Sequence, residues 1–304
     1  MAQVLLKSSA FLAIMLLGVV LRRRGFFGPK DYLIPMKLVL NITLPAAAIT
    51  GFASYRPEPK LLLCAVVGFA LNWAVLLIAA LVSRSKPREI RAVWLNTVPG
   101  YNIGAFALPF VQSFLSPAGV VSCCLFDAGS ALMCAGGTFA LSGAILDGGG
   151  RISPRRIGKN LLSSRPFLTY ALMLVLSLAG VAIPQPIVNF LSPLASANAF
   201  LSMMMVGMMF NVKLDQQMWK DVAGMAAVRV VMAAAAAGGC LLLPLPPEVR
   251  QALAITSFAP VSIASTALSE RAGGDPALAA CVSSLTIPIS VTVIIALLTL
   301  FGTL

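Results

Sequence analysis

Two stretches of the chain combine residues that interrupt helices with side chains that can hydrogen-bond a solute. The first stretch spans 96–109, and its residues of interest are Pro99, Asn102, Gly104 and Pro109. The second spans 256–266, and its residues of interest are Pro260, Ser262, Ser265 and Thr266. Proline removes a backbone donor and clashes with the preceding helical turn, so each stretch is predicted to interrupt a helix.

A pair of interrupted helices offers binding chemistry without a charged side chain. The N-terminus of a half-helix carries unpaired N–H groups and a partial positive charge, and both favour an anion such as a carboxylate. Asn102 adds two amide donors, and Ser262, Ser265 and Thr266 add hydroxyl groups. We therefore predict that these four residues bind an anionic substrate and that the prolines and Gly104 shape the breaks.

One carboxyl group falls within a long apolar segment. Asp127 lies about ten residues into this segment, which places it about 15 Å from the membrane surface if the segment is a spanning helix. Burial penalises the charged form of a carboxyl group, so Asp127 could bind a proton at neutral pH and couple transport to a proton gradient. The alternative is a packing role in which Asp127 hydrogen-bonds to Ser122 or Ser130.

One arginine also falls within an apolar segment. Arg229 could be a substrate counter-ion, a partner of Asp127, or a side chain that snorkels to the membrane surface. Snorkelling is slightly favoured because charged residues stand at one end of its segment. Weaker candidates for the site are three asparagines in apolar segments, which more often bond a neighbouring helix than a substrate: Asn41, Asn72 and Asn198.

The composition identifies the environment in which these residues act. Hydrophobic residues make up 59% of the 304 residues and charged residues 11%, against about 45–50% and 25% in ordinary globular domains. The chain is therefore predicted to lie in a lipid bilayer rather than to bind nucleic acid. It has no histidine, and its six cysteines show no metal-binding spacing, so we expect neither an enzyme nor a bound metal or organic cofactor.

Charge clusters and Pro/Gly breaks divide the chain into ten apolar segments of about the length of a membrane-spanning helix. These segments are 3–21, 32–54, 60–82, 89–113, 117–146, 165–182, 187–211, 219–243, 248–270 and 276–303. They predict an all-α polytopic membrane protein with a first five-helix repeat in 1–146, a cytoplasmic connecting loop in 147–164 and a second repeat in 165–304.

The two halves correspond at an offset of 159 residues. At this offset Glu89 falls on Glu248 and Pro117 on Pro276, so the interrupted fourth and ninth segments occupy equivalent places. A repeat with an odd number of spans must re-enter the membrane upside down, which predicts two inverted repeats. Corresponding interruptions in such repeats are the best sequence indication of a transporter's binding site.

Basic residues predict the orientation of the chain. Seventeen Lys and Arg residues fall in the connections after the odd-numbered segments, and four fall on the opposite side. Because positive charge marks the cytoplasmic side, both termini are predicted to face outward, away from the cytoplasm.

Several short motifs resemble the auxin efflux carrier family. They are Asn102-x-Gly104-x-x-x-x-Pro109, Leu44-Pro45, and Ala259-Pro260 followed by Gly273-Gly274-Asp275-Pro276. The resemblance covers essentially the whole chain and fits a bacterial member, because the 147–164 connection is short. It implies the fold of bile-acid symporters and sodium/proton antiporters, with interrupted helices 4 and 9 crossing, an elevator movement, and contact of Asn102 with a substrate carboxylate. Ser265 stands where plant members have a crossing proline.

We therefore expect a secondary transporter of a small organic anion, such as a dicarboxylate or an auxin-like acid, in the bacterial cytoplasmic (inner) membrane. Its partners would be this solute and the lipid bilayer, with a homodimer as the assembly to test, and its coupling ion would be a proton or sodium. The alternatives are an ion-coupled symporter of larger, bile-acid-like amphipathic acids and an anion channel.

Overall fold

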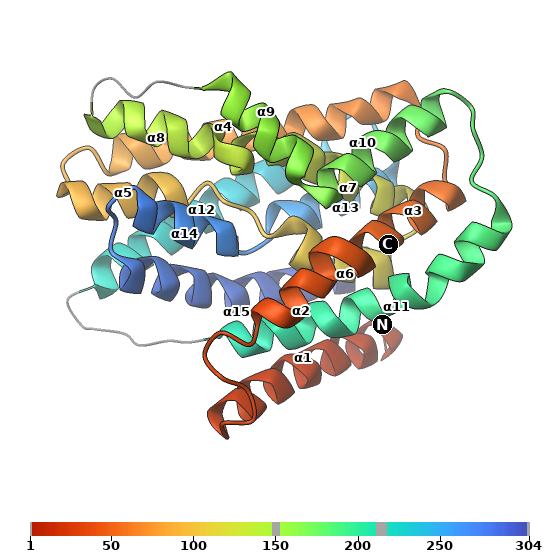
Figure 1. Ribbon diagram of the computed structural model, residues 1–304, viewed down its shortest axis with the longest axis horizontal. Coiled ribbons are helices and arrows are strands. Elements are labelled where there is room, and N and C mark those ends of the chain that lie inside the picture. The colour runs from red at the N-terminus through yellow and green to blue at the C-terminus, as the bar shows by residue number, and fades with distance from the viewer. Residues whose placement is uncertain (1, 148–152, 211–217, 303–304) are drawn as a thin grey trace.

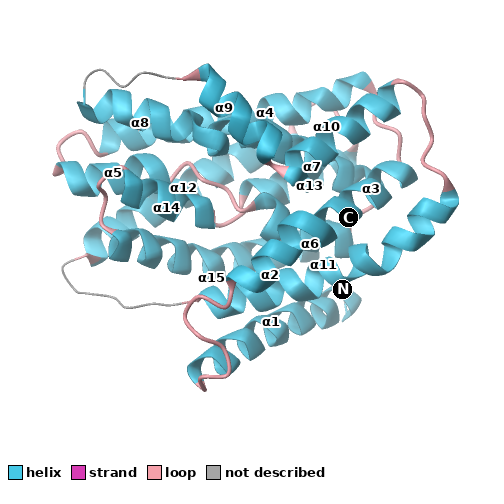
Figure 2. Cartoon of the chain, in the orientation of Figure 1, coloured by secondary structure: helices cyan, strands magenta, loops and turns pink. Residues whose placement is uncertain are grey.

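The computed structural model describes residues 2–147, 153–210 and 218–302, and within these ranges the chain is helical with no strand (Figure 2). The longer helices are α1 (Ala2–Arg23), α4 (Leu62–Val82), α7 (Pro117–Leu132), α11 (Gln185–Met209), α12 (Trp219–Leu241) and α15 (Pro276–Phe301). The shorter ones are α2 (Leu33–Leu38), α3 (Leu44–Ser54), α5 (Arg88–Thr97), α6 (Leu108–Phe114), α8 (Thr138–Asp147), α9 (Pro154–Ser163), α10 (Arg165–Leu178), α13 (Pro247–Ser257) and α14 (Ile263–Arg271). Among the described residues, four short helical turns of other types adjoin the α-helices. They are the 3-10 turn η2 (Pro59–Leu61) and the π-helical turns η1 (Val39–Thr43), η3 (Ile103–Ala107) and η4 (Met133–Gly137).

Among the described residues, seven helical stretches are long and apolar enough to cross a membrane, or eight if the bent pair α9–α10 counts as one span. They begin and end close to seven of the ten predicted segments. The chain is thus an all-helical, multi-pass membrane protein, as the composition predicts. The fourth and ninth predicted segments are not among these stretches because each is divided by a break. The sixth is not among them because α10 has 14 residues, or about 21 Å of helix.

Apolar side chains cover much of the outer surface. Leu6 is 72% exposed on α1, Phe190 is 76% exposed on α11, and Leu172 on α10 is also exposed. A soluble monomer rarely leaves so many large apolar side chains in contact with water. Lipid acyl chains are the environment that suits this surface.

Small residues set the closest helix contacts. At Gly68 on α4, a Cβ atom would collide with the carbonyl oxygen of Phe126, and at Gly129 on α7 it would collide with that of Ala65. The two helices therefore touch backbone to backbone, a packing that small residues permit in membranes. In Figure 1, α1 lies along α11 at one edge of the molecule, and α8 and α9 lie at the opposite edge.

The segment predicted as the 147–164 connecting loop is largely helical. Asp147 ends α8, residues 148–152 lie outside the described ranges, and α9 occupies Pro154–Ser163. The Ser153 hydroxyl caps α9 by accepting a hydrogen bond from the Arg156 N–H at 3.4 Å. Helices α9 and α10 meet at an angle of 83°.

The two interrupted helices lie side by side and meet at their breaks, and we call this meeting point the crossing. The first half of one, α5, packs against the second half of the other, α14, while α6 contacts α13. Helix α12 packs along α13, and α7 packs against both α13 and α6. The two breaks are thereby held within the interior of the helix bundle.

Candidate functional site

The two helix breaks are joined by a backbone hydrogen bond. Helix α5 ends at Thr97 and the chain becomes helical again at Ile103, while α13 ends at Ser257 and α14 begins at Ile263. Across the crossing, the Asn102 N–H donates to the Pro260 carbonyl at 2.9 Å. Asn102 and Pro260, which are 158 positions apart in the sequence, therefore bring the two predicted interruptions together at one point.

Arg229 connects both breaks from α12. Its guanidinium donates to the carbonyl of Val98 at 2.5 Å and to those of Ala259 and Pro260 at 2.6 and 3.2 Å. It also lies 4.0 Å from the centre of the Tyr101 ring, a cation–π distance. These carbonyls follow the C-terminal ends of α5 and α13, where the helix dipole favours a positive charge.

The snorkelling interpretation of Arg229 is therefore wrong. The residue is 4% exposed, and its side chain points inward to the crossing rather than outward to a membrane surface. Three carbonyl acceptors and an aromatic ring compensate for burial of the guanidinium, so it gains nothing by extending to water. No ion pair joins Arg229 to Asp127 within the described ranges.

A cavity of about 500 Å³ adjoins the crossing. Its walls come from α2 and η1 on one side and from the two breaks, α14 and α15 on the other. The lining residues are Tyr32, Leu33, Met36, Leu40, Asn102, Ala105, Ser262, Ala264, Thr266, Ala267, Glu270, Pro276 and Ala280. We refer to it as the crossing cavity.

Three of the four predicted substrate-binding residues line the crossing cavity: Asn102, Ser262 and Thr266. The Asn102 side chain has no hydrogen-bond partner among the described residues, so its amide donors are available to a ligand. The Ser262 hydroxyl accepts from the Ala264 N–H at 3.3 Å and retains its own proton for donation.

Ser265 lies elsewhere. It is buried against Gly100, where a Cβ atom would collide with the Ser265 hydroxyl. This serine therefore packs the two breaks together rather than lining the cavity, and Gly100 is required for the close approach. Of the break residues, Pro260 supplies the carbonyl shared by Asn102 and Arg229. Pro99 lies in the first break, Gly104 within η3 and Pro109 in the first turn of α6.

Asp127 on α7 lies next to Gly104, just after the first break. The Tyr170 hydroxyl of α10 lies 3.0 Å from its carboxylate, and a Cβ atom added at Gly104 would lie 3.1 Å from the same oxygen. The serines considered as partners bond elsewhere, Ser122 to the Ala118 carbonyl and Ser130 to Asn72 and Gly68. Asp127 thus connects α7 to α10 beside the site.

The three weaker asparagine candidates all have protein partners. Asn72 donates to the Gly68 carbonyl at 2.8 Å and to Ser130 on α7 at 3.0 Å. Asn198 on α11 accepts from the Thr43 hydroxyl at 2.9 Å, and Asn41 donates to the Lys37 carbonyl of its own helix at 2.7 Å. None of them lines the crossing cavity.

Tyr32, Glu270 and Tyr170 lie at or beside the site but are not among the residues predicted from the sequence. Glu270 is the one charged residue among those that line the crossing cavity, and Tyr32 adds a phenol group from the start of α2. Glu270 lies in the last turn of α14, where a charge pattern alone suggests a solvated helix end. Tyr170 could have been found as a phenol group in an apolar segment, because a buried tyrosine hydroxyl usually has a partner.

Comparison with known proteins identifies no relative of the chain. Neither the protein-family models nor the curated proteins searched contain a match to the chain. The resemblance to auxin efflux carriers therefore rests on the short motifs of the sequence.

Proposed function

We propose that this membrane protein is a secondary transporter that binds a small organic anion in the crossing cavity. The observation that supports the proposal most strongly is the hydrogen bond between the Asn102 N–H and the Pro260 carbonyl. It brings the breaks of two membrane helices together beside a cavity of about 500 Å³, a volume in the range of small-molecule sites. Interrupted helices at membrane depth are tolerated where they line such a cavity.

The chemistry around the cavity favours one carboxylate group. Helical structure begins at Ile103 and Ile263, next to the cavity, so both breaks present the positive end of a helix dipole to it. Asn102 and Ser262 supply side-chain donors. Arg229 holds the two breaks together through its hydrogen bonds to their carbonyls and adds a positive charge near the cavity.

Glu270 restricts which anions fit. Its carboxylate lines the same cavity, and a second negative charge on the ligand would be repelled by it. We therefore expect a monocarboxylate, or an acid with a hydrogen-bond donor at its far end, to bind better than a dicarboxylate. Larger amphipathic acids and a channel mechanism are the alternatives that the assay below separates.

We propose that the chain forms ten membrane segments in two inverted five-helix repeats and moves as an elevator, as the resemblance to auxin efflux carriers implies. We also propose that it lies in a bacterial inner membrane with both termini outside. The positions of the two breaks at the same place in each half of the sequence support the repeat. Proton coupling would use Asp127, which has a single described partner, Tyr170.

Ligand binding to purified protein tests the proposal. A thermal-shift screen should include monocarboxylates, dicarboxylates, indole acids and bile acids, and a hit should be followed by counterflow in proteoliposomes. Saturable uptake with counterflow supports a carrier, whereas transport without counterflow supports a channel. If no acid in the screen stabilises the protein, the anion proposal is wrong.

Asn102→Ala tests the site itself. The substitution removes the two free amide donors, so we expect affinity for the acid to fall by about tenfold or more while the protein remains folded. Asn41→Ala is the matched control, because Asn41 bonds the carbonyl of its own helix outside the cavity. Equal affinity in wild type and Asn102→Ala would remove Asn102 from the site.

A further inference from the structure

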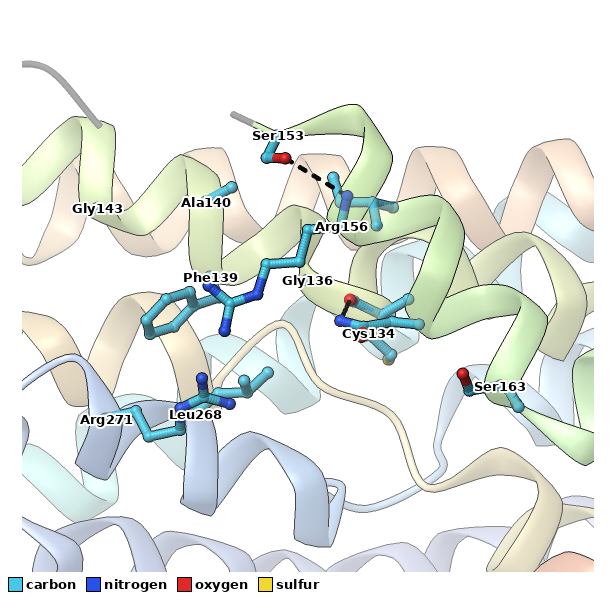
Figure 3. Close-up of a pocket in the computed structure, with 14 residues that line it drawn as sticks. Cys134, Gly136, Phe139, Ala140, Gly143, Ser153, Arg156, Ser163, Leu268 and Arg271 are labelled. Carbon is cyan, nitrogen blue, oxygen red and sulfur yellow. Dashed lines mark hydrogen bonds between the residues drawn. The ribbon is translucent and has the colours of Figure 1, made fainter. Parts of the chain in front are cut away.

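A second pocket of about 500 Å³ lies between α8, η4, α9 and α14 (Figure 3). Arg156 of α9 and Arg271 of α14 extend into it from opposite sides, and the Arg271 guanidinium lies 5.4 Å from the centre of the Phe139 ring. We call it the arginine pocket. Its lining is separate from that of the crossing cavity, although α14 contributes to both.

Among the described residues, the two guanidiniums have no anionic partner. No Asp or Glu is among the described residues that line the arginine pocket. Within the described ranges, neither Arg156 nor Arg271 forms an ion pair, and the carboxylate of Asp147 at the end of α8 is paired with Arg88 at 2.6 Å. Two like charges that share a pocket repel each other unless an anion lies between them.

The remaining lining indicates the kind of anion. The Ser153 hydroxyl accepts a hydrogen bond from the backbone N–H of Arg156, so the proton of the Ser153 hydroxyl can be donated to a ligand. The guanidinium fork matches two oxygens of a phosphate group at once. Phe139, Ile157 and Leu268 provide an apolar wall, and the pocket is larger than inorganic phosphate alone requires.

We infer that the arginine pocket binds a phosphate group carried by a larger molecule, either the headgroup of an anionic lipid or a soluble phosphate compound. Arg156 and Arg271 bind the phosphate oxygens, and the apolar wall contacts the rest of the ligand. Leu268 and Arg271 of α14 face this pocket, while Thr266 and Glu270 of the same helix face the crossing cavity. The bound phosphate would therefore tie α9 to one half of an interrupted helix.

The test measures thermal stability of the full chain with and without a phosphate probe. Soluble phosphate is represented by pyrophosphate added to detergent-purified protein, with sodium chloride at equal ionic strength as the reference. Lipid phosphate is represented by nanodiscs of phosphatidylcholine compared with nanodiscs of equal parts phosphatidylcholine and phosphatidylglycerol. A ligand that binds the folded state raises the unfolding temperature as its concentration rises.

The variant Arg156→Gln/Arg271→Gln removes both guanidiniums from the pocket. The matched control is Arg155→Gln/Lys159→Gln, which removes the same charge from residues of α9 that do not line the pocket. We expect the probe to stabilise wild type and control alike, and its apparent affinity for the pocket variant to fall by about tenfold or more. If the double variant does not fold, the single Arg156→Gln variant, which changes one exposed side chain, is compared with wild type and the control instead.

The outcomes separate the sources of phosphate. Stabilisation by pyrophosphate assigns the pocket to a soluble ligand, and stabilisation by phosphatidylglycerol alone assigns it to a lipid headgroup. If neither probe stabilises the protein, or if both double variants lose the effect equally, the inference is wrong. None of these measurements uses transport, so the result is independent of the proposed function.

Discussion

Replacing Arg229 by methionine removes the side chain that joins the two helix breaks while keeping most of its volume. In the variant, the carbonyls of Val98 and Ala259 lose their only described side-chain donor. Pro260 retains the hydrogen bond from the Asn102 N–H. The change therefore leaves two carbonyl acceptors unpaired at the crossing and removes the cation–π contact with Tyr101.

The expected loss of stability follows from these contacts. Each buried acceptor left without a donor costs about 1–3 kcal/mol, and the lost cation–π contact costs about 1 kcal/mol. Because the variant no longer buries a charged group, part of this loss is offset. We expect a net decrease of about 3 kcal/mol in the free energy of unfolding, or a Tm lower by roughly 5 °C for a chain of this length.

Arg250→Met provides the matched control. Arg250 also donates to a carbonyl at a helix end, that of Leu241 at 2.8 Å, but this hydrogen bond is exposed to solvent. Exposed contacts of this kind contribute about 1 kcal/mol or less. Thermal unfolding followed by tryptophan fluorescence compares the two variants. Equal Tm values for Arg229→Met and Arg250→Met would refute the role assigned to Arg229.

Three further substitutions test residues around the crossing. Asp127→Asn should abolish stimulation of transport by a pH gradient but allow exchange, and a variant that still responds to the gradient in proteoliposomes excludes Asp127 as the proton site. Glu270→Gln should raise affinity for dicarboxylates by about tenfold with little change for monocarboxylates, as measured by ligand titration; equal changes for both would show that Glu270 does not select by charge. Gly100→Ala should destabilise the protein by about 1–3 kcal/mol because the new methyl group collides with Ser265, whereas Gly238→Ala, which meets open space, should leave the Tm close to that of wild type or raise it.

Local sequence was sufficient to locate the interruptions. Proline, glycine and asparagine between 96 and 109 determine backbone geometry over a few residues, and α5 does end at Thr97. The position of Ser265 does not follow from local sequence, because its packing against Gly100 depends on how closely the two breaks approach. The end of α10, where the chain turns at Gly180 with a φ of 74°, does not follow from it either.

The sequence by itself determined the membrane environment, the helical class and the two stretches where helices are interrupted, since composition and Pro/Gly breaks act locally. The tertiary structure decided which polar groups meet. Arg229 contacts Val98, 131 positions away, and Asp127 contacts Tyr170, 43 positions away, and no pattern in the sequence specifies either pair. Buried polar groups take the partners that helix packing brings within hydrogen-bonding distance, and that packing depends on the whole fold.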